Sequence, residues 1–409
     1  MGVFREIPPT AGWPVYAKDI AGLFKIKARG SLEEDFKGYL KVPYARVTNS
    51  GTAALYLILE TLKGLSPKRS VIIPSYICPL VPLAAKRAGL EVVVSDINAE
   101  DFNFDLAQLE QICLKDKDIS AIIVAHLGGL PLNLRALGRI AAKFGILMIE
   151  DCAQSLGAVY ENRLTGTYGD FSFFSLCRGK GLTIYEGGVA VTNNKEYIRP
   201  LENKIKELVR NDFFEEGLKI LEFFGYWVFY RPELFWFVFK LPQAFWNWRG
   251  RKARAALEEF SQNFPLHRVW PLRKAIGHLS FHRLEEEIGK QREKAAFYIE
   301  RLKGMRGVRV LREGPQERAV YPYLTLIFDR PQMRQKALLA LESKGLGVSF
   351  VYSAAITDYG YLKGLVFGQD PRGGRALAER ALTLSTSTFL KEREQILILD
   401  TIAKNIAGF

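Results

Sequence analysis

Lys180 is the residue of this chain best suited to chemistry, and two further features precede it in a fixed order. Its side-chain amine can form an imine with an aldehyde. Asp151, in the run Glu150-Asp151-Cys152-Ala153-Gln154, offers a carboxylate that can keep a pyridine nitrogen protonated. Ser50-Gly51-Thr52 predicts a helix start, whose free backbone amides can bind a phosphate. Amine, acid and helix start together predict a site for pyridoxal phosphate.

Each predicted role has an ordinary structural alternative. We expect Lys180 and Asp151 to be catalytic, and Gly51, Thr52 and Ser175 to bind the cofactor phosphate. Lys180 is otherwise a surface lysine in a glycine-flanked loop, and Asp151 a carboxylate that caps a turn. Thr52 is otherwise a helix N-cap, and Ser175 a hydroxyl bonded to the backbone.

The elements that must position these residues alternate along the chain. Short apolar runs predict strands, and helical patterns lie between them, with strands at 71–74, 91–96, 121–125 and 146–151 and helices at 55–62, 82–88 and 134–144. This alternation indicates an α/β fold with a mostly parallel sheet covered on both faces. Functional groups gather at the carboxyl ends of such strands, where His126 and Asp151 are placed.

Three segments are expected. Residues 1–204 form the large cofactor-binding domain, 205–262 an aromatic and basic insertion, and 263–409 a smaller α+β domain with its linking helix. The last assignment depends on a change of pattern near Glu286, after which long helices at 288–302, 333–344 and 392–406 surround a strand-like run at 321–328.

An aromatic stretch at 218–248 stands out within the insertion. Four tryptophans lie there, and a basic cluster follows them at Arg249, Arg251, Lys252 and Arg254. Each apolar half is shorter than the roughly 20 residues that a membrane-spanning helix needs. Three interpretations remain: peripheral membrane contact through 218–254, a buried subunit interface, or a lid over the active site.

The composition limits the partners and the compartment. A net charge of +13 favours anionic partners, and we find no nucleic-acid-binding motif. The cysteines Cys78, Cys113, Cys152 and Cys177 lack metal-ligand spacing, so reduced thiols and no metal are expected. The first residues lack the apolar core of a signal peptide, so we expect a cytoplasmic protein, either free or at the inner face of the membrane.

With these motifs assembled, the chain resembles the nucleotide-sugar aminotransferases of the DegT–StrS group, which have the fold-type-I architecture. The motifs that carry this resemblance lie at residues 50–55, 126–131, 150–154, 169–170, 174–175, 180 and 186–188. The resemblance implies pyridoxal phosphate as cofactor and amino transfer, usually from glutamate, to a nucleotide- or lipid-linked keto sugar. It also implies a homodimer with active sites at the subunit boundary.

The resemblance implies further contacts. Gln154 is expected beside the ring hydroxyl, and His126 either near the ring or as a buried core residue. Tyr76 is expected to cover the ring, because Cys78 falls where the family usually has an aromatic residue. Arg178, close to Lys180, is expected either to bind a substrate phosphate or to remain a solvated charge.

The chain also departs from the family. Leu266 falls where the family has a cross-subunit Asn, leaving Arg268 as the nearby match, and the segment at Tyr352 lacks the family's His. We expect Arg268 and Tyr352 to contact substrate. The alternatives are amino transfer to a non-sugar ketone such as a lipid, sugar dehydration, and a silent membrane-associated binding protein. Family dehydratases replace the lysine with His, so Lys180 argues against dehydration.

Overall fold

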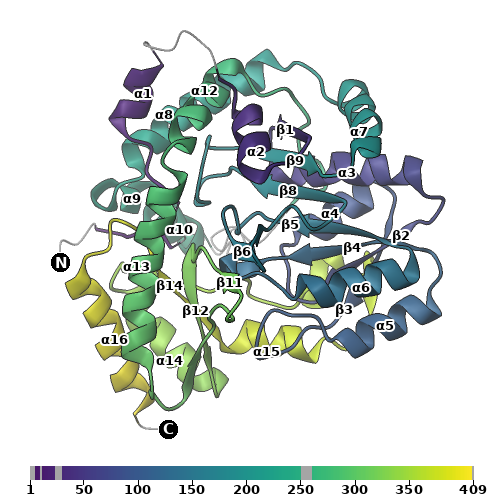
Figure 1. Ribbon diagram of the computed structural model, residues 1–409. Coiled ribbons are helices and arrows are strands. Elements are labelled where there is room, and N and C mark those ends of the chain that lie inside the picture. Colours follow the sequence, from purple (N-terminus) through teal and green to yellow (C-terminus); the bar gives the residue numbers. More distant parts are fainter. Residues whose placement is uncertain (1–4, 10–11, 24–29, 250–259, 408–409) are drawn as a thin grey trace.

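The computed structural model describes residues 5–9, 12–23, 30–249 and 260–407 (Figure 1). Within these ranges an eight-stranded sheet has the order β1-β9-β8-β5-β4-β2-β3-β13. Its strands are β1 (Tyr44–Thr48), β9 (Gly188–Thr192), β8 (Phe171–Ser175), β5 (Leu147–Asp151), β4 (Ile119–Ala125), β2 (Ser70–Pro74), β3 (Glu91–Ser95) and β13 (Val366–Gly368). The pairs from β8 to β13 are parallel, and β9 is antiparallel to both its neighbours. The predicted α/β class is therefore confirmed.

Helices cover both faces of this sheet, as parallel strands require (Figure 1). α3 (Gly51–Leu65) packs against α4 (Leu80–Arg87) and α7 (Lys195–Leu208), whereas α5 (Leu106–Lys115) packs against α6 (Leu134–Phe144). Near the amino terminus lie α1 (Ala17–Gly22) and α2 (Leu32–Leu40). The central strand β4 is buried along its whole length, which explains its run of Ile, Val and Ala.

A second, smaller layer is built from the carboxyl-terminal part of the chain. β10 (Val308–Val310), β12 (Tyr323–Phe328) and β14 (Ala381–Ser385) form an antiparallel sheet. The helices around it are α13 (Leu284–Leu302), α14 (Pro331–Glu342) and α16 (Glu392–Ile406), and α12 (Pro271–Phe281) links it to the insertion. The same part of the chain returns β13 and α15 (Arg372–Arg380) to the large sheet, where β13 pairs with β3.

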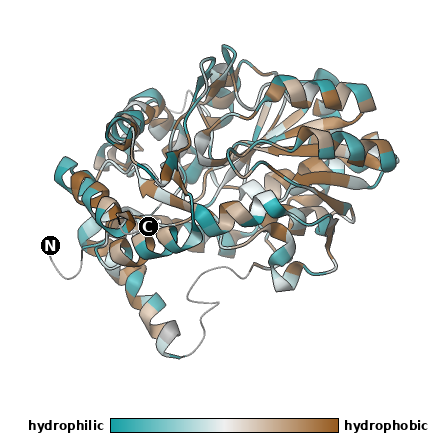
Figure 2. Cartoon of the chain, turned by 90° about the horizontal axis from the view of Figure 1, so that it is seen from below, coloured by the Kyte–Doolittle hydropathy of each residue, from teal (hydrophilic) through white to brown (hydrophobic). Residues whose placement is uncertain are grey.

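The aromatic stretch folds as three helices: α8 (Phe213–Phe229), α9 (Pro232–Val238) and α10 (Lys240–Trp248). Seen from below, α10 extends away from the rest of the chain (Figure 2). Arg251, Lys252 and Arg254 of the basic cluster lie outside the described residues. Within the described ranges, no helix has both the length and the apolar character needed to cross a bilayer.

Candidate active site

A cavity of about 280 Å³ opens at the carboxyl ends of β4, β5 and β8 and at the start of α3. This is the edge of a parallel sheet at which ligands are expected. Most of the site residues predicted from the sequence line it, namely Gly51, Thr52, His126, Asp151, Gln154, Ser175, Lys180 and Tyr352. Residues from distant parts of the sequence therefore meet around one space.

The start of α3 forms one end of the cavity. Ser50 is the N-cap, since its hydroxyl accepts a hydrogen bond from the Ala53 amide at 3.0 Å. The alternative role of Thr52 as the N-cap is therefore wrong, and its side chain lines the cavity instead. Ser175, at the end of β8, lies against Gly51, where an added Cβ would come within 3.2 Å of its Cβ. An anion at this end would meet the positive end of the helix dipole.

Gly188 explains why two glycines follow Glu186. It begins β9, pairing with Ser175 on one side and Thr48 on the other. A Cβ at this position would lie 2.4 Å from the Ser50 carbonyl oxygen and 2.5 Å from the Gly51 nitrogen. Only glycine allows β9 to approach the helix start this closely, so Gly188 helps to place the end of α3 beside the loop of Lys180.

Asp151 ends β5 and is almost fully buried in the cavity wall. Its Oδ1 accepts a hydrogen bond from the Ala153 amide at 3.0 Å. Burial raises the pKa of this carboxyl, while the Ala153 amide and the charge of Lys180 act in the opposite direction. A buried carboxylate in this state is stabilised by a further cationic or N–H partner, such as a protonated ring nitrogen.

Lys180 lies in the loop between β8 and β9, with its backbone amide bonded to the Cys177 carbonyl at 3.1 Å. Side chains of α8 and α12 contact this loop. Lys219 of α8 forms an ion pair with Glu186 at 3.0 Å, and the Arg273 guanidinium donates to the Glu186 carbonyl. These contacts fix the position of Glu186 in the loop that carries Lys180.

A buried ion pair lies beside these contacts of α8 and α12. Glu216 of α8 accepts hydrogen bonds from the Arg273 guanidinium, and both side chains are fully buried. A buried guanidinium requires such a partner, because an unpaired charge in the interior is strongly destabilising. α8 is therefore built into the support of the Lys180 loop. Nothing local in the sequence indicates this pair, because the two residues meet only after folding.

His126 is held at both ring nitrogens. Its Nδ1 accepts the Leu132 amide at 3.2 Å, so the proton lies on Nε2, which is 3.1 Å from Glu150. Glu150 is itself buried and accepts the amides of Gly166, Tyr168 and Gly169. His126 thus forms a fixed part of the wall, which combines both expectations: it lines the cavity and is a satisfied buried residue.

Cys152 completes a cluster with His126 and Glu150 whose ligand atoms lie within 4.8 Å of one another. Hydrogen bonds from backbone amides already occupy Glu150 and His126, so the cluster is explained as part of the wall. Burial raises the pKa of the Cys152 thiol, which keeps it neutral and a poor metal ligand.

Gln154 links the cavity wall to the smaller layer. Its Oε1 accepts the Gly128 amide at 2.8 Å and the Tyr323 hydroxyl at 2.5 Å. Tyr323 belongs to β12, more than a hundred residues away in sequence, and nothing local in the sequence singled it out. The apolar wall residues Leu80, Phe173 and Phe264 were likewise not predicted.

Tyr76 does not take the expected position over the cavity. It is fully buried behind the wall, where its hydroxyl donates to the Tyr352 carbonyl at 2.9 Å and accepts the Tyr352 amide at 3.0 Å. Tyr76 therefore fixes the backbone of Tyr352, and it is Tyr352 and Cys78 that line the cavity. The physical reason is that the Tyr76 ring packs against Phe102 in the core.

Arg178 and Arg268 lie outside the cavity wall of their own chain. Arg178 is exposed, and its guanidinium donates to the Tyr185 hydroxyl at 3.2 Å and lies over that ring. This geometry favours the alternative of a solvated charge. Arg268 is also exposed, on a segment whose backbone pairs with Arg210.

Comparison with known proteins gives this cavity its context. The model of the DegT/DnrJ/EryC1/StrS aminotransferase family matches residues 26–212 and 260–403. The chain belongs to this family. The family model passes over residues 213–259, which contain the helices α8, α9 and α10. The core of the chain is thus that of the family, and the aromatic helices lie outside the part that the family model matches.

Over the aligned segments, curated relatives are about one-third identical to this member of the family. GDP-perosamine synthase of Escherichia coli O157:H7 is 32% identical over 198 residues, covering 44% of this chain and 53% of the relative. UDP-4-amino-4,6-dideoxy-N-acetyl-beta-L-altrosamine transaminase of Campylobacter jejuni is 35% identical over 171 residues, covering 42% and 45%. The chain spans about half the length of these relatives.

Solved structures show the same fold over nearly the whole chain. The putative sugar aminotransferase Spr1654 of Streptococcus pneumoniae in its PLP form has a TM-score of 0.74 at 19% identity and covers 98% of this chain and 99% of its own. Helicobacter pylori PseC, an aminotransferase of pseudoaminic acid biosynthesis, has a TM-score of 0.76 at 17% identity, covering 99% and 100%. The fold-type-I architecture is therefore that of the present chain.

Proposed function

We propose that this protein is a pyridoxal-phosphate-dependent aminotransferase that moves an amino group, with glutamate as donor, to a nucleotide- or lipid-linked keto sugar. The observation that carries the proposal is the meeting of Lys180, Asp151 and the start of α3 around one cavity. Family membership and the activities named for the relatives support it.

The residues of the cavity fit the chemical groups of this cofactor. The amides at Gly51 and Thr52, with the Ser175 hydroxyl, offer donors to a phosphate at the positive end of α3. Asp151 offers its buried carboxylate to a ring nitrogen and holds a proton there. The Lys180 amine lies along the same wall, within reach of a carbonyl group.

Lys180 has two tasks in this proposal. Its Nζ would hold the cofactor at the aldehyde carbon, and when free it would move a proton at the substrate carbon. When bound, pyridoxal phosphate supplies an electron sink for that carbon. The fixed wall of His126 and Gln154 would orient the cofactor ring in the cavity.

The proposal includes two features of assembly. The first is a homodimer with active sites at the subunit boundary; the exposed position of Arg268, near the wall residues Phe264 and Pro265, supports a role for Arg268 in the cavity of the partner. The second is peripheral contact of 218–254 with a membrane. The exposed apolar side chains of α8, α9 and α10 support it.

A cofactor titration tests the proposal. The wild type should develop a saturable long-wavelength absorbance band on addition of pyridoxal phosphate, and Lys180→Ala should not. Lys195→Ala, an exposed lysine at the start of α7, serves as the matched control and should behave as the wild type. A band of equal strength in Lys180→Ala, or none in the wild type, would refute the assignment.

A further inference from the structure

An apolar stripe runs along α9 and α10. Leu241, Phe245 and Trp248 recur at intervals of four and three residues, which places them on one face of α10, and Val238 at the end of α9 precedes them. All four side chains are exposed, and Trp248 is 80% accessible. We call these residues the α10 stripe. Large apolar side chains gathered on one exposed face usually mark an interaction site.

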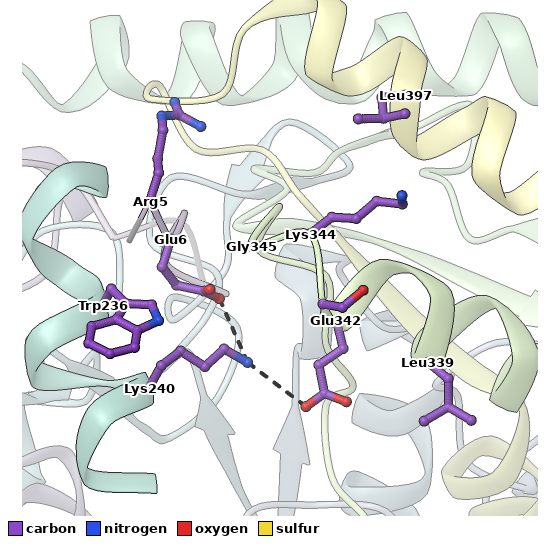
Figure 3. A pocket seen from close by; sticks show the side chains of 10 residues that line it. Arg5, Glu6, Trp236, Lys240, Leu339, Glu342, Lys344, Gly345 and Leu397 are labelled. Carbon is purple, nitrogen blue, oxygen red and sulfur yellow. Dashed lines mark ion pairs between the residues drawn. The ribbon is translucent and has the colours of Figure 1, made fainter. Parts of the chain in front are cut away.

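The base of α10 is anchored, whereas its body stands away from the sheets. Lys240 points into a cleft of about 820 Å³ between the insertion and the smaller layer, where its Nζ lies 3.9 Å from both Glu6 and Glu342 (Figure 3). Burial raises the pKa of Glu6 to about 7, and Lys240 opposes that rise. Beyond this anchor, α10 packs chiefly on α9 (Figure 2). The stripe thus lies on a projecting helix whose first residue, Lys240, is held by Glu6 and Glu342.

In the sequence, the charged residues within and beside the stripe are all basic. From residue 234 to residue 257 the sequence has no acidic residue, and it contains Lys240, Arg249, Arg251, Lys252 and Arg254. Arg249 directly follows α10, and its guanidinium lies 5.1 Å from the centre of the Phe245 ring. A cation is therefore attached to the edge of the apolar stripe.

This charge pattern selects the occupant. In a two-fold contact between copies, the same surface meets itself, so the basic residues would face their own counterparts and repel. An anionic bilayer neutralises them, and its interface accommodates Trp beside aliphatic side chains.

We propose that the α10 stripe inserts into the interface of an anionic bilayer, with Arg249 at the headgroups. This deepens the proposed function by naming the contact surface and the lipid charge, while the docking itself does not depend on the chemistry at Lys180. α8 connects the two regions, because it leads through α9 to the stripe and its Lys219 pairs with Glu186 of the Lys180 loop. The active site is thereby held close to the membrane, where an amphiphilic acceptor is available.

Vesicle flotation tests the proposal with the full-length chain. The wild type should float with phosphatidylcholine vesicles that contain phosphatidylglycerol, and remain unbound with phosphatidylcholine alone. The double variant Phe245→Ser, Trp248→Ser should bind at least about tenfold more weakly, because it lacks the two aromatic groups that the bilayer would bury. Leu114→Ser on α5, a residue 54% exposed, is the matched control and should float as the wild type.

Charge and assembly are examined in the same assay. Arg249→Ala should weaken binding about fivefold, and the equally exposed Arg372→Ala on α15 should not. Lys180→Ala should still float, so a failure of the cofactor chemistry leaves this result unaffected. Wild type that binds neither vesicle would overturn the proposal. So would a wild-type oligomer that dissociates in the double variant without any vesicle binding, since this would assign the stripe to a second copy.

Discussion

The surroundings of Asp151 determine what its carboxylate can do. Its carboxylate ends a buried strand, lines the cavity and accepts one backbone amide. Asp170 is a useful contrast, since it is also partly buried and accepts the Met148 amide at 2.9 Å, but it lies outside the cavity wall. Burial raises the pKa of both carboxyls, so it is their position that distinguishes them.

This contrast gives a prediction. Asp151→Asn keeps the size of the side chain and loses the charge that holds a ring nitrogen protonated, so transamination should fall by about 100- to 1000-fold. Cofactor affinity, measured by absorbance titration, should change much less. Asp170→Asn should lower the unfolding midpoint and leave the rate constant nearly unchanged. Equal losses of rate in the two variants would show that Asp151 acts only through folding.

Single positions were predictable where a local motif carried them. Asp151 ends a predicted strand and Gly51 opens a predicted helix. Lys180 and Ser175 were predicted from their motif, since the strand β8 before them was not among the predicted strands. The direction of Tyr76 was not legible, because it depends on Phe102 and Tyr352, which come from other elements. Partners such as Tyr323 and Arg273 were missed for the same reason.

The junction of β9 with α3 makes a second prediction. Gly188→Ala should push β9 away from Ser50 and Gly51, costing about 1–3 kcal/mol of unfolding free energy through overpacking. Because the helix start moves with it, affinity for pyridoxal phosphate should drop by about tenfold or more.

A second glycine provides the control. Gly138 lies within α6, where an added Cβ would find nothing within 4 Å among the described residues. Gly138→Ala should therefore stabilise the protein by about 0.5–1 kcal/mol and leave cofactor affinity unchanged. Urea unfolding of the two variants measures the change in stability, and cofactor titration measures the change in affinity for pyridoxal phosphate. A harmless Gly188→Ala would contradict the close approach of β9 to the helix start.

Elements with strong periodicity were predicted well. The helix expected at 134–144 is α6, and the one expected at 392–406 is α16. The strand β13 was not foreseen, because three residues carry no period and its partner β3 lies far away in the sequence. Short edge strands are specified by tertiary pairing more than by local pattern.

The whole molecule joins a core that the family model matches to an aromatic segment outside that match, and this segment has contacts on its inner side and exposed residues on its outer side. Inward, α8 supports the Lys180 loop through Lys219 and through the buried pair of Glu216 and Arg273. Outward, α9 and α10 expose the α10 stripe. The sequence indicated that 218–248 is unusual, but its inner role emerges only from contacts between distant residues. Membrane contact remains a prediction for the flotation assay.

The central claim is amino transfer, and the donor half-reaction tests it most directly. Wild type loaded with pyridoxal phosphate should be mixed with labelled glutamate in the absence of any ketone. The account predicts 2-oxoglutarate in an amount that matches the bound cofactor, together with loss of the long-wavelength band. Lys180→Ala should form none. Fully loaded wild type that leaves both glutamate and its absorbance unchanged would contradict the assignment of this chain as a glutamate-dependent aminotransferase.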